Sequence, residues 1–137
     1  MSFSGVNYLA VLVAAIAAFA FGAAWYMTLS RSWLAAVGLR PEQMAKRSPV
    51  PFVVSFVALL VMAWVLAGML AHFGAGQVTV RNGIVSGLFL WLGFVITTLA
   101  VNNAYAQRKL SLTAIDGLHW LGVLVVQGAV IGAMGAG

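Results

Sequence analysis

Four long stretches of the chain are almost entirely apolar, and polar residues gather in the segments between them. A helix needs roughly 20 apolar residues to cross about 30 Å of hydrocarbon, and each stretch is long enough. None of the four contains lysine or arginine, and none alternates apolar with polar residues as a membrane β-strand does. We therefore predict four transmembrane helices, at residues 8–27, 52–72, 83–101 and 114–134.

The composition strengthens this prediction. The 137 residues, enough for one domain, are 64% hydrophobic and only 7% charged, whereas soluble domains carry about 25% charged residues. The net charge of +5 does not indicate nucleic-acid binding, because the basic residues are spread over loops and form no continuous face. The chain has no cysteine, which excludes disulfides and thiolate metal sites. We expect neither a metal nor a cofactor.

The basic residues favour one side of the membrane. Six of the seven lie in the loops that follow the first and third spans: Arg31, Arg40, Lys46, Arg47, Arg108 and Lys109. Only Arg81 lies between the second and third spans. Loops rich in lysine and arginine stay in the cytoplasm. We therefore predict a multi-pass membrane protein whose two termini both lie outside the cytoplasm.

The loop after the first span is the longest and contains a further helical segment. Residues 29–39 (LSRSWLAAVGL) predict a short helix in the membrane interface, with Trp33 at the depth of the headgroups. Pro41 is expected to end it, because the residue before a proline disfavours helix. The predicted architecture is an all-α, four-helix transmembrane bundle, N-out and C-out, with this short interfacial helix.

Small residues recur at four-residue spacing in the predicted spans. They are Ala14, Ala18 and Gly22 in the first, Gly83 and Gly87 in the third, and Gly128 and Gly132 in the fourth. In lipid, helices associate through close packing at small residues, because the hydrophobic drive between them is weak. We expect contacts within one chain, and the alternative is a contact between copies in a homo-oligomer.

Polar residues of the third and fourth spans converge at one depth, near the predicted cytoplasmic surface. The candidates are Thr98, Asn102, Asp116 and His119. If the polar faces of these two spans meet, Asn102 could hydrogen-bond Asp116 or His119. The cluster could be a polar clamp that fixes helix register, or a proton or substrate site open to the cytoplasm. Asp116 could also simply favour the start of its helix.

The two histidines are far apart. His72 ends the second span, about 30 Å across the bilayer from Asp116 at 1.5 Å rise per residue. The histidines therefore cannot share a metal ion within one chain. Gly68, one turn before His72, could leave room for a flat porphyrin-like ring on the imidazole. The interpretation that we favour is an interfacial histidine that binds nothing.

Three segments carry a resemblance to a known family. They are residues 7–26 (NYLAVLVAAIAAFAFGAAWY), residues 49–68 (PVPFVVSFVALLVMAWVLAG) and residues 90–133, which contain WLGFVITTLAVNN and IDGLHW. The chain resembles the small bacterial membrane proteins grouped as domain of unknown function 1761. The resemblance implies four helices and a bacterial membrane, and it supplies neither an activity nor catalytic residues.

The residues indicate no catalytic constellation, because nucleophile elbows, zinc-binding HExxH and phosphate-binding glycine loops are missing from the sequence. The leading hypothesis is a non-enzymatic scaffold or accessory subunit that contacts the bilayer and either a second copy or other membrane proteins. A second hypothesis is a small oligomeric transporter or channel that uses the polar cluster. A third is a cofactor or pigment binder through His72 or His119.

Overall fold

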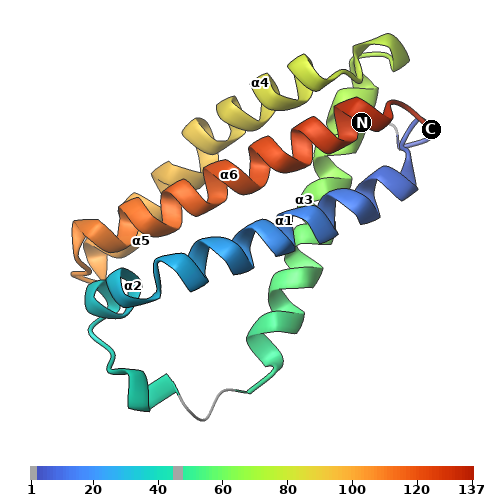
Figure 1. Cartoon of the computed structure of the whole chain (residues 1–137). Helices are drawn as coiled ribbons and strands as arrows, with labels where there is room; N and C mark the ends of the chain where they lie inside the picture. Colours follow the sequence, from blue (N-terminus) through green and yellow to red (C-terminus); the bar gives the residue numbers. More distant parts are fainter. Residues whose placement is uncertain (1–2, 45–47) are drawn as a thin grey trace.

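The computed structural model describes residues 3–44 and 48–137, so the predicted cytoplasmic residues Lys46 and Arg47 lie outside the described part. Every regular element in the described residues is helical (Figure 1). In chain order they are α1 (Tyr8–Thr28), α2 (Ser30–Val37), the 3-10 turn η1 (Pro41–Met44), α3 (Val50–His72), the 3-10 turn η2 (Ala75–Gln77), α4 (Val80–Leu90), the π-helical turn η3 (Trp91–Val95), α5 (Ile96–Tyr105) and α6 (Leu110–Met134).

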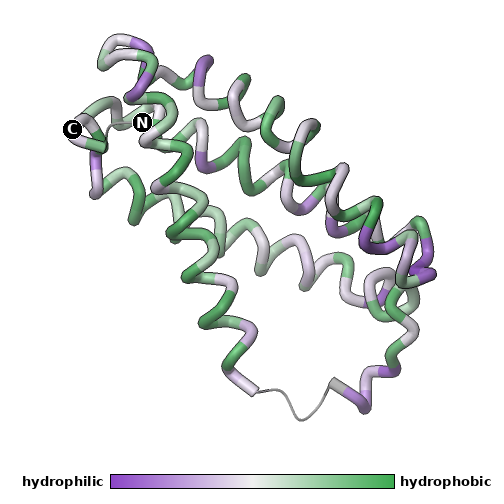
Figure 2. Tube along the Cα trace, turned by 180° about the vertical axis from the view of Figure 1, so that it is seen from behind, coloured by the Kyte–Doolittle hydropathy of each residue, from purple (hydrophilic) through white to green (hydrophobic). Residues whose placement is uncertain are grey.

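The predicted four-helix architecture is confirmed. Four helices are long and apolar enough to cross a membrane: Tyr8–Thr28, Val50–His72, Val80–Tyr105 and Leu110–Met134. The third runs through α4, η3 and α5 without a break in helical structure. Each helix extends its predicted range by at most four residues at either end. Figure 2 shows the apolar residues along the helices and most hydrophilic residues near their ends, as a multi-pass membrane protein requires.

Glycines bring α4 and α6 into backbone contact, and α6 lies between α4 and α1 (Figure 1). A Cβ atom on Gly83 would overlap the carbonyl of Gly128, and one on Gly128 would overlap the carbonyl of Gly83. One turn along, a Cβ on Gly87 would come within 2.9 Å of the Leu124 carbonyl oxygen. Gly132 lies against the backbone of Thr79 in the same way. The small residues of the third and fourth spans therefore allow these two helices to pack without space for side chains.

The other face of α6 packs on α1 and α3. Ala14, Ala18 and Ala63 are fully buried, as is Val123 of α6. Gln127 is also fully buried, and its Nε2 donates to the Leu59 carbonyl at 3.0 Å, which links α6 to α3. Figure 1 shows α3 crossing behind α1 at a steep angle, so that the N-terminal part of α3 diverges from the bundle.

Both chain ends lie at one end of the bundle (Figure 1). The backbone N–H of Gly137 donates to the Gly5 carbonyl at 3.1 Å. At the opposite end, Arg108 Nη1 donates to the Val37 carbonyl at 3.4 Å, and Lys109 Nζ donates to the Ala35 carbonyl at 3.2 Å. The two basic residues of the second predicted cytoplasmic loop thus contact the backbone of the first, as is possible only if both loops lie on the same side. Which side of a membrane they occupy stays a prediction.

The short helix in the first loop forms, but it ends earlier than Pro41 predicts. α2 stops at Gly38, which adopts a left-handed conformation with φ of 83° and donates its N–H to the Leu34 carbonyl. Glycine accepts this conformation without a Cβ clash, so it terminates the helix first. The position of α2 in a membrane interface stays a prediction.

Candidate functional site

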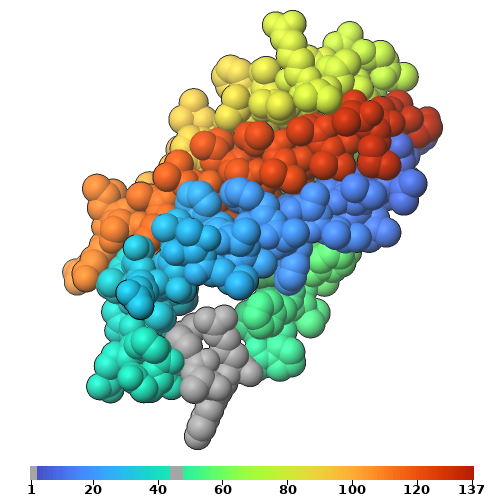
Figure 3. Space-filling view, viewed as in Figure 1, coloured from blue at the N-terminus to red at the C-terminus, as the bar shows by residue number. Residues whose placement is uncertain are grey.

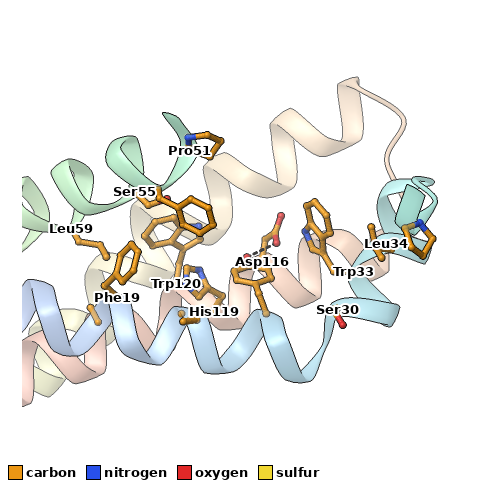
Figure 4. Close-up of a pocket in the computed structure, with 16 residues that line it drawn as sticks. Phe19, Ser30, Trp33, Leu34, Pro51, Ser55, Leu59, Asp116, His119 and Trp120 are labelled. Atoms are coloured by element: carbon orange, nitrogen blue, oxygen red, sulfur yellow. Dashed lines mark hydrogen bonds between the residues drawn. The ribbon is translucent and has the colours of Figure 1, made fainter. Parts of the chain in front are cut away.

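A cavity of about 740 Å³ lies between the C-terminal half of α1, α2, the N-terminal part of α3 and the start of α6. Figure 3 shows the molecule hollowed between α1 and this part of α3, and Figure 4 shows the side chains inside. The residues that line it are Ala18, Phe19, Gly22, Ala23, Tyr26, Ser30, Trp33, Leu34, Pro41, Pro51, Phe52, Ser55, Leu59, Asp116, His119 and Trp120. Its volume falls within the range of roughly 300–1,000 Å³ typical of small-molecule sites.

The cavity exists because the N-terminal part of α3 diverges from the other helices. Leu59 is buried against the other helices, whereas Ser55, one turn earlier, and Phe52, two turns earlier, are exposed. On the opposite wall, α1 offers only the small residues Ala18, Gly22 and Ala23 between its aromatic side chains. Divergence of one helix and small residues on its neighbour together leave the space unfilled.

Asp116 is the acidic group of this cavity. The Tyr26 hydroxyl donates to Asp116 Oδ1 at 2.6 Å, so α1 and α6 are joined by a short, charge-assisted hydrogen bond. The preceding residue, Trp25, makes a second link between the same helices, because its indole Nε1 donates to the Ile115 carbonyl at 3.1 Å. Asp116 remains partly exposed, and Figure 4 shows its carboxylate on the cavity side. Within the described residues only Oδ1 of this carboxylate accepts a hydrogen bond, so Oδ2 can accept one from a further donor.

His119 lies one turn deeper and is 8% exposed. Its imidazole occupies the space above Gly22, where a Cβ atom would come within 2.9 Å of Nε2. The ring centroid is 4.8 Å from that of Tyr26 and 4.7 Å from that of Trp120. Nδ1 is buried without a hydrogen-bond partner among the described residues, which is unusual for a polar atom in a protein interior.

The predicted contact between Asn102 and Asp116 or His119 is wrong. Asp116 pairs with Tyr26 of α1, and the Asn102 side chain is exposed. The neighbouring Asn103 reaches α6 instead, where its Nδ2 donates to Thr113 Oγ1 at 2.9 Å.

Thr98 also lies outside the cavity. It is exposed, and its hydroxyl donates to the Phe94 carbonyl one turn back in its own helix. The reason is that two different faces of α6 contact two different neighbours. Gly117 meets Ile96 of the third span, whereas Asp116, on a different side of the helix, meets α1. The glycines therefore decide which face of α6 the third span covers.

Three aromatic residues of the site are not among the candidates that the sequence indicates, although Trp33 was predicted to lie at the depth of the headgroups. Tyr26, Trp33 and Trp120 line the cavity, and the Tyr26 and Trp33 rings meet edge to face with centroids 6.2 Å apart. Their shared depth with Asp116 was the available signal. Aromatic belts occur at that same depth, so the signal could not separate the two roles.

The second histidine has no part in this site. His72 is exposed at the last residue of α3, and α3 reaches the cavity only with its opposite end. The space beside Gly68 is filled by the Phe3 ring, whose centroid is 4.5 Å from that of Trp64. The room that Gly68 could have left for a ring on His72 is therefore taken by the protein itself.

A family model described as "Protein of unknown function (DUF1761)" matches residues 9–132. This match includes all residues of the cavity wall and nearly the full length of the four long helices. None of the curated proteins and none of the solved structures compared with the chain matches it.

Proposed function

Because the chain belongs to the DUF1761 family, for which no activity is assigned, we propose its function from the cavity. We propose that this membrane protein binds a small amphiphilic molecule between α1, α3 and α6, in a binding or transport role rather than a catalytic one. The observation that carries the proposal is a cavity of about 740 Å³ with mostly apolar walls and one carboxylate. Mostly apolar walls with a few placed polar groups are typical of small-molecule sites.

The amphiphilic character of the proposed ligand follows from the position of the polar groups in the cavity wall. Asp116, which accepts a hydrogen bond from Tyr26, is at one side of the cavity, whereas Leu59 and Phe19 form its deeper apolar wall. A ligand with a polar head and an apolar body would satisfy both regions. An ordinary polar metabolite would lose hydration against the apolar wall without regaining hydrogen bonds there.

The scaffold hypothesis has less direct support, because it rests mainly on the scarcity of charged groups. It stays a prediction, as do a homo-oligomer and association with other membrane subunits. The cavity is a positive feature that a pure scaffold does not need, and it favours the transporter or carrier hypothesis. A bacterial inner membrane remains the location that we propose for this role.

Native mass spectrometry of protein purified in a mild detergent tests the proposal. We expect wild type to retain a bound small molecule, and Ser55→Phe to lose it because the larger ring fills the cavity. Val57→Phe is the matched control, since it adds similar bulk to an exposed position of the same helix. Equal retention by all three proteins, or no bound small molecule in wild type, would contradict the proposal. A bound polypeptide in its place would support the scaffold hypothesis.

A further inference from the structure

The chemistry of the cavity wall narrows the class of ligand. We infer that the site selects an organic cation, such as a lipophilic amine or onium ion, whose charge is held by Asp116 within a group of aromatic rings. This inference rests on the proposed binding role and adds the charge of the ligand to it.

The first argument is the balance of charge. Asp116 is the only charged side chain among the described residues that line the cavity, and no described lysine or arginine lines it. The whole chain carries +5, so an acidic group in this cavity is opposite in sign to the overall charge. The Tyr26 hydroxyl stabilises one carboxylate oxygen but does not neutralise the charge. A cation in the cavity would supply the missing counter-charge in a place of low dielectric.

The second argument is the aromatic surroundings of this carboxylate. The ring centroids of Trp33 and Tyr26 are 6.2 Å apart. The His119 imidazole lies between Tyr26 and Trp120, with centroid distances of 4.8 Å to Tyr26 and 4.7 Å to Trp120. Figure 4 shows the Trp33 and Trp120 side chains to either side of Asp116 in the view. Aromatic faces attract cations through their quadrupole, and such groups of rings recognise quaternary ammonium ions. The same faces disfavour an anion, so the two features select for one charge.

The third argument is the hydration of the ligand. Small inorganic cations keep tightly held water or require several oxygen ligands. The described acidic and histidine residues offer no group of three that could hold a metal ion. An organic cation, whose charge is spread beneath apolar substituents, loses little hydration in an aromatic cavity and matches its apolar wall. The chemistry therefore favours an organic ion over a metal ion.

The test compares two ions of nearly equal size and opposite charge, tetraphenylphosphonium and tetraphenylborate. Saturable binding to the purified full chain is measured by equilibrium dialysis against protein-free micelles, which corrects for partition into detergent. We expect wild type to bind the phosphonium more tightly than the borate. Asp116→Asn should weaken phosphonium binding by about tenfold or more, the loss expected for a charged partner. It should not weaken borate binding, because it removes a charge that repels the anion.

Asp116→Asn is a suitable variant because the amide keeps the size of the carboxylate and its oxygen can still accept from Tyr26. Unchanged thermal stability of this variant would separate loss of charge from loss of fold. If borate binds as tightly as phosphonium, and Asp116→Asn changes neither, the cation inference fails. If Ser55→Phe still abolishes both in that case, the proposed cavity function stands. Saturable binding of neither ion would overturn the inference and leave the proposed function to its own test.

Discussion

Gly22 has a particular neighbour rather than a general packing role. Its hydrogen faces the His119 imidazole, and a Cβ atom there would come within 2.9 Å of Nε2. This ring is held between Tyr26 and Trp120, so it cannot move away without disturbing the cavity wall. A single missing side chain on α1 therefore determines where a buried histidine of α6 sits.

We predict that Gly22→Leu lowers the stability of the protein by about 1–3 kcal/mol, the usual cost of overpacking. Ala20→Leu, at an exposed position of the same helix, should be close to neutral. Thermal unfolding in detergent measures both. His119→Ala should recover part of the loss when combined with Gly22→Leu, because it vacates the space. Equal stability of Gly22→Leu and wild type would contradict the contact.

At the scale of elements, the closest contact in the bundle is between α4 and α6. Gly83 and Gly128 place backbone against backbone, where no side chain can adjust to relieve a clash. This contact also leaves the Asp116 face of α6 to α1 and α3. Packing of the third and fourth spans is thus linked to the formation of the cavity on the opposite side.

We predict that Gly128→Leu destabilises the fold more than Gly22→Leu does, by about 3 kcal/mol or more, because two helices must separate. Gly93→Leu is the control, since a Cβ on Gly93 meets nothing within 4 Å. Melting temperatures in detergent should fall for Gly128→Leu and stay near wild type for Gly93→Leu. A loss of oligomer size with an intact monomer fold would instead place Gly128 at a contact between copies.

On the scale of the whole molecule, the two ends of the bundle differ in charge. One end holds both termini, and the other holds the described basic residues of the first and third loops, with Arg108 and Lys109 donating to the α2 backbone. Loops rich in lysine and arginine stay on the cytoplasmic side of a membrane, so this difference would orient the bundle with its basic end in the cytoplasm. The cavity would then open near the cytoplasmic surface.

Cysteine labelling in intact cells tests this orientation, and the native chain has no cysteine to interfere. Ala75→Cys lies in η2 at the end that holds the termini, and Ser48→Cys lies at the opposite end, both exposed. We predict that an impermeant thiol reagent labels Ala75→Cys and spares Ser48→Cys until the cells are opened. The reverse pattern would invert the orientation and place the cavity near the outer surface.

The sequence by itself determined the number, type and approximate limits of the long helices, because the length of an apolar run and the absence of lysine and arginine within it are properties of consecutive residues. It also indicated the depth of Asp116 in the membrane and the role of small residues such as Gly83 and Gly128 in close helix packing. Only the tertiary structure decided that Asp116 pairs with Tyr26 rather than Asn102. Depth along a helix follows from position in the chain. Which neighbour each face of the helix contacts depends on which faces can approach most closely. Here the glycines of α6 pack one face against α4, so that the face with Asp116 contacts α1.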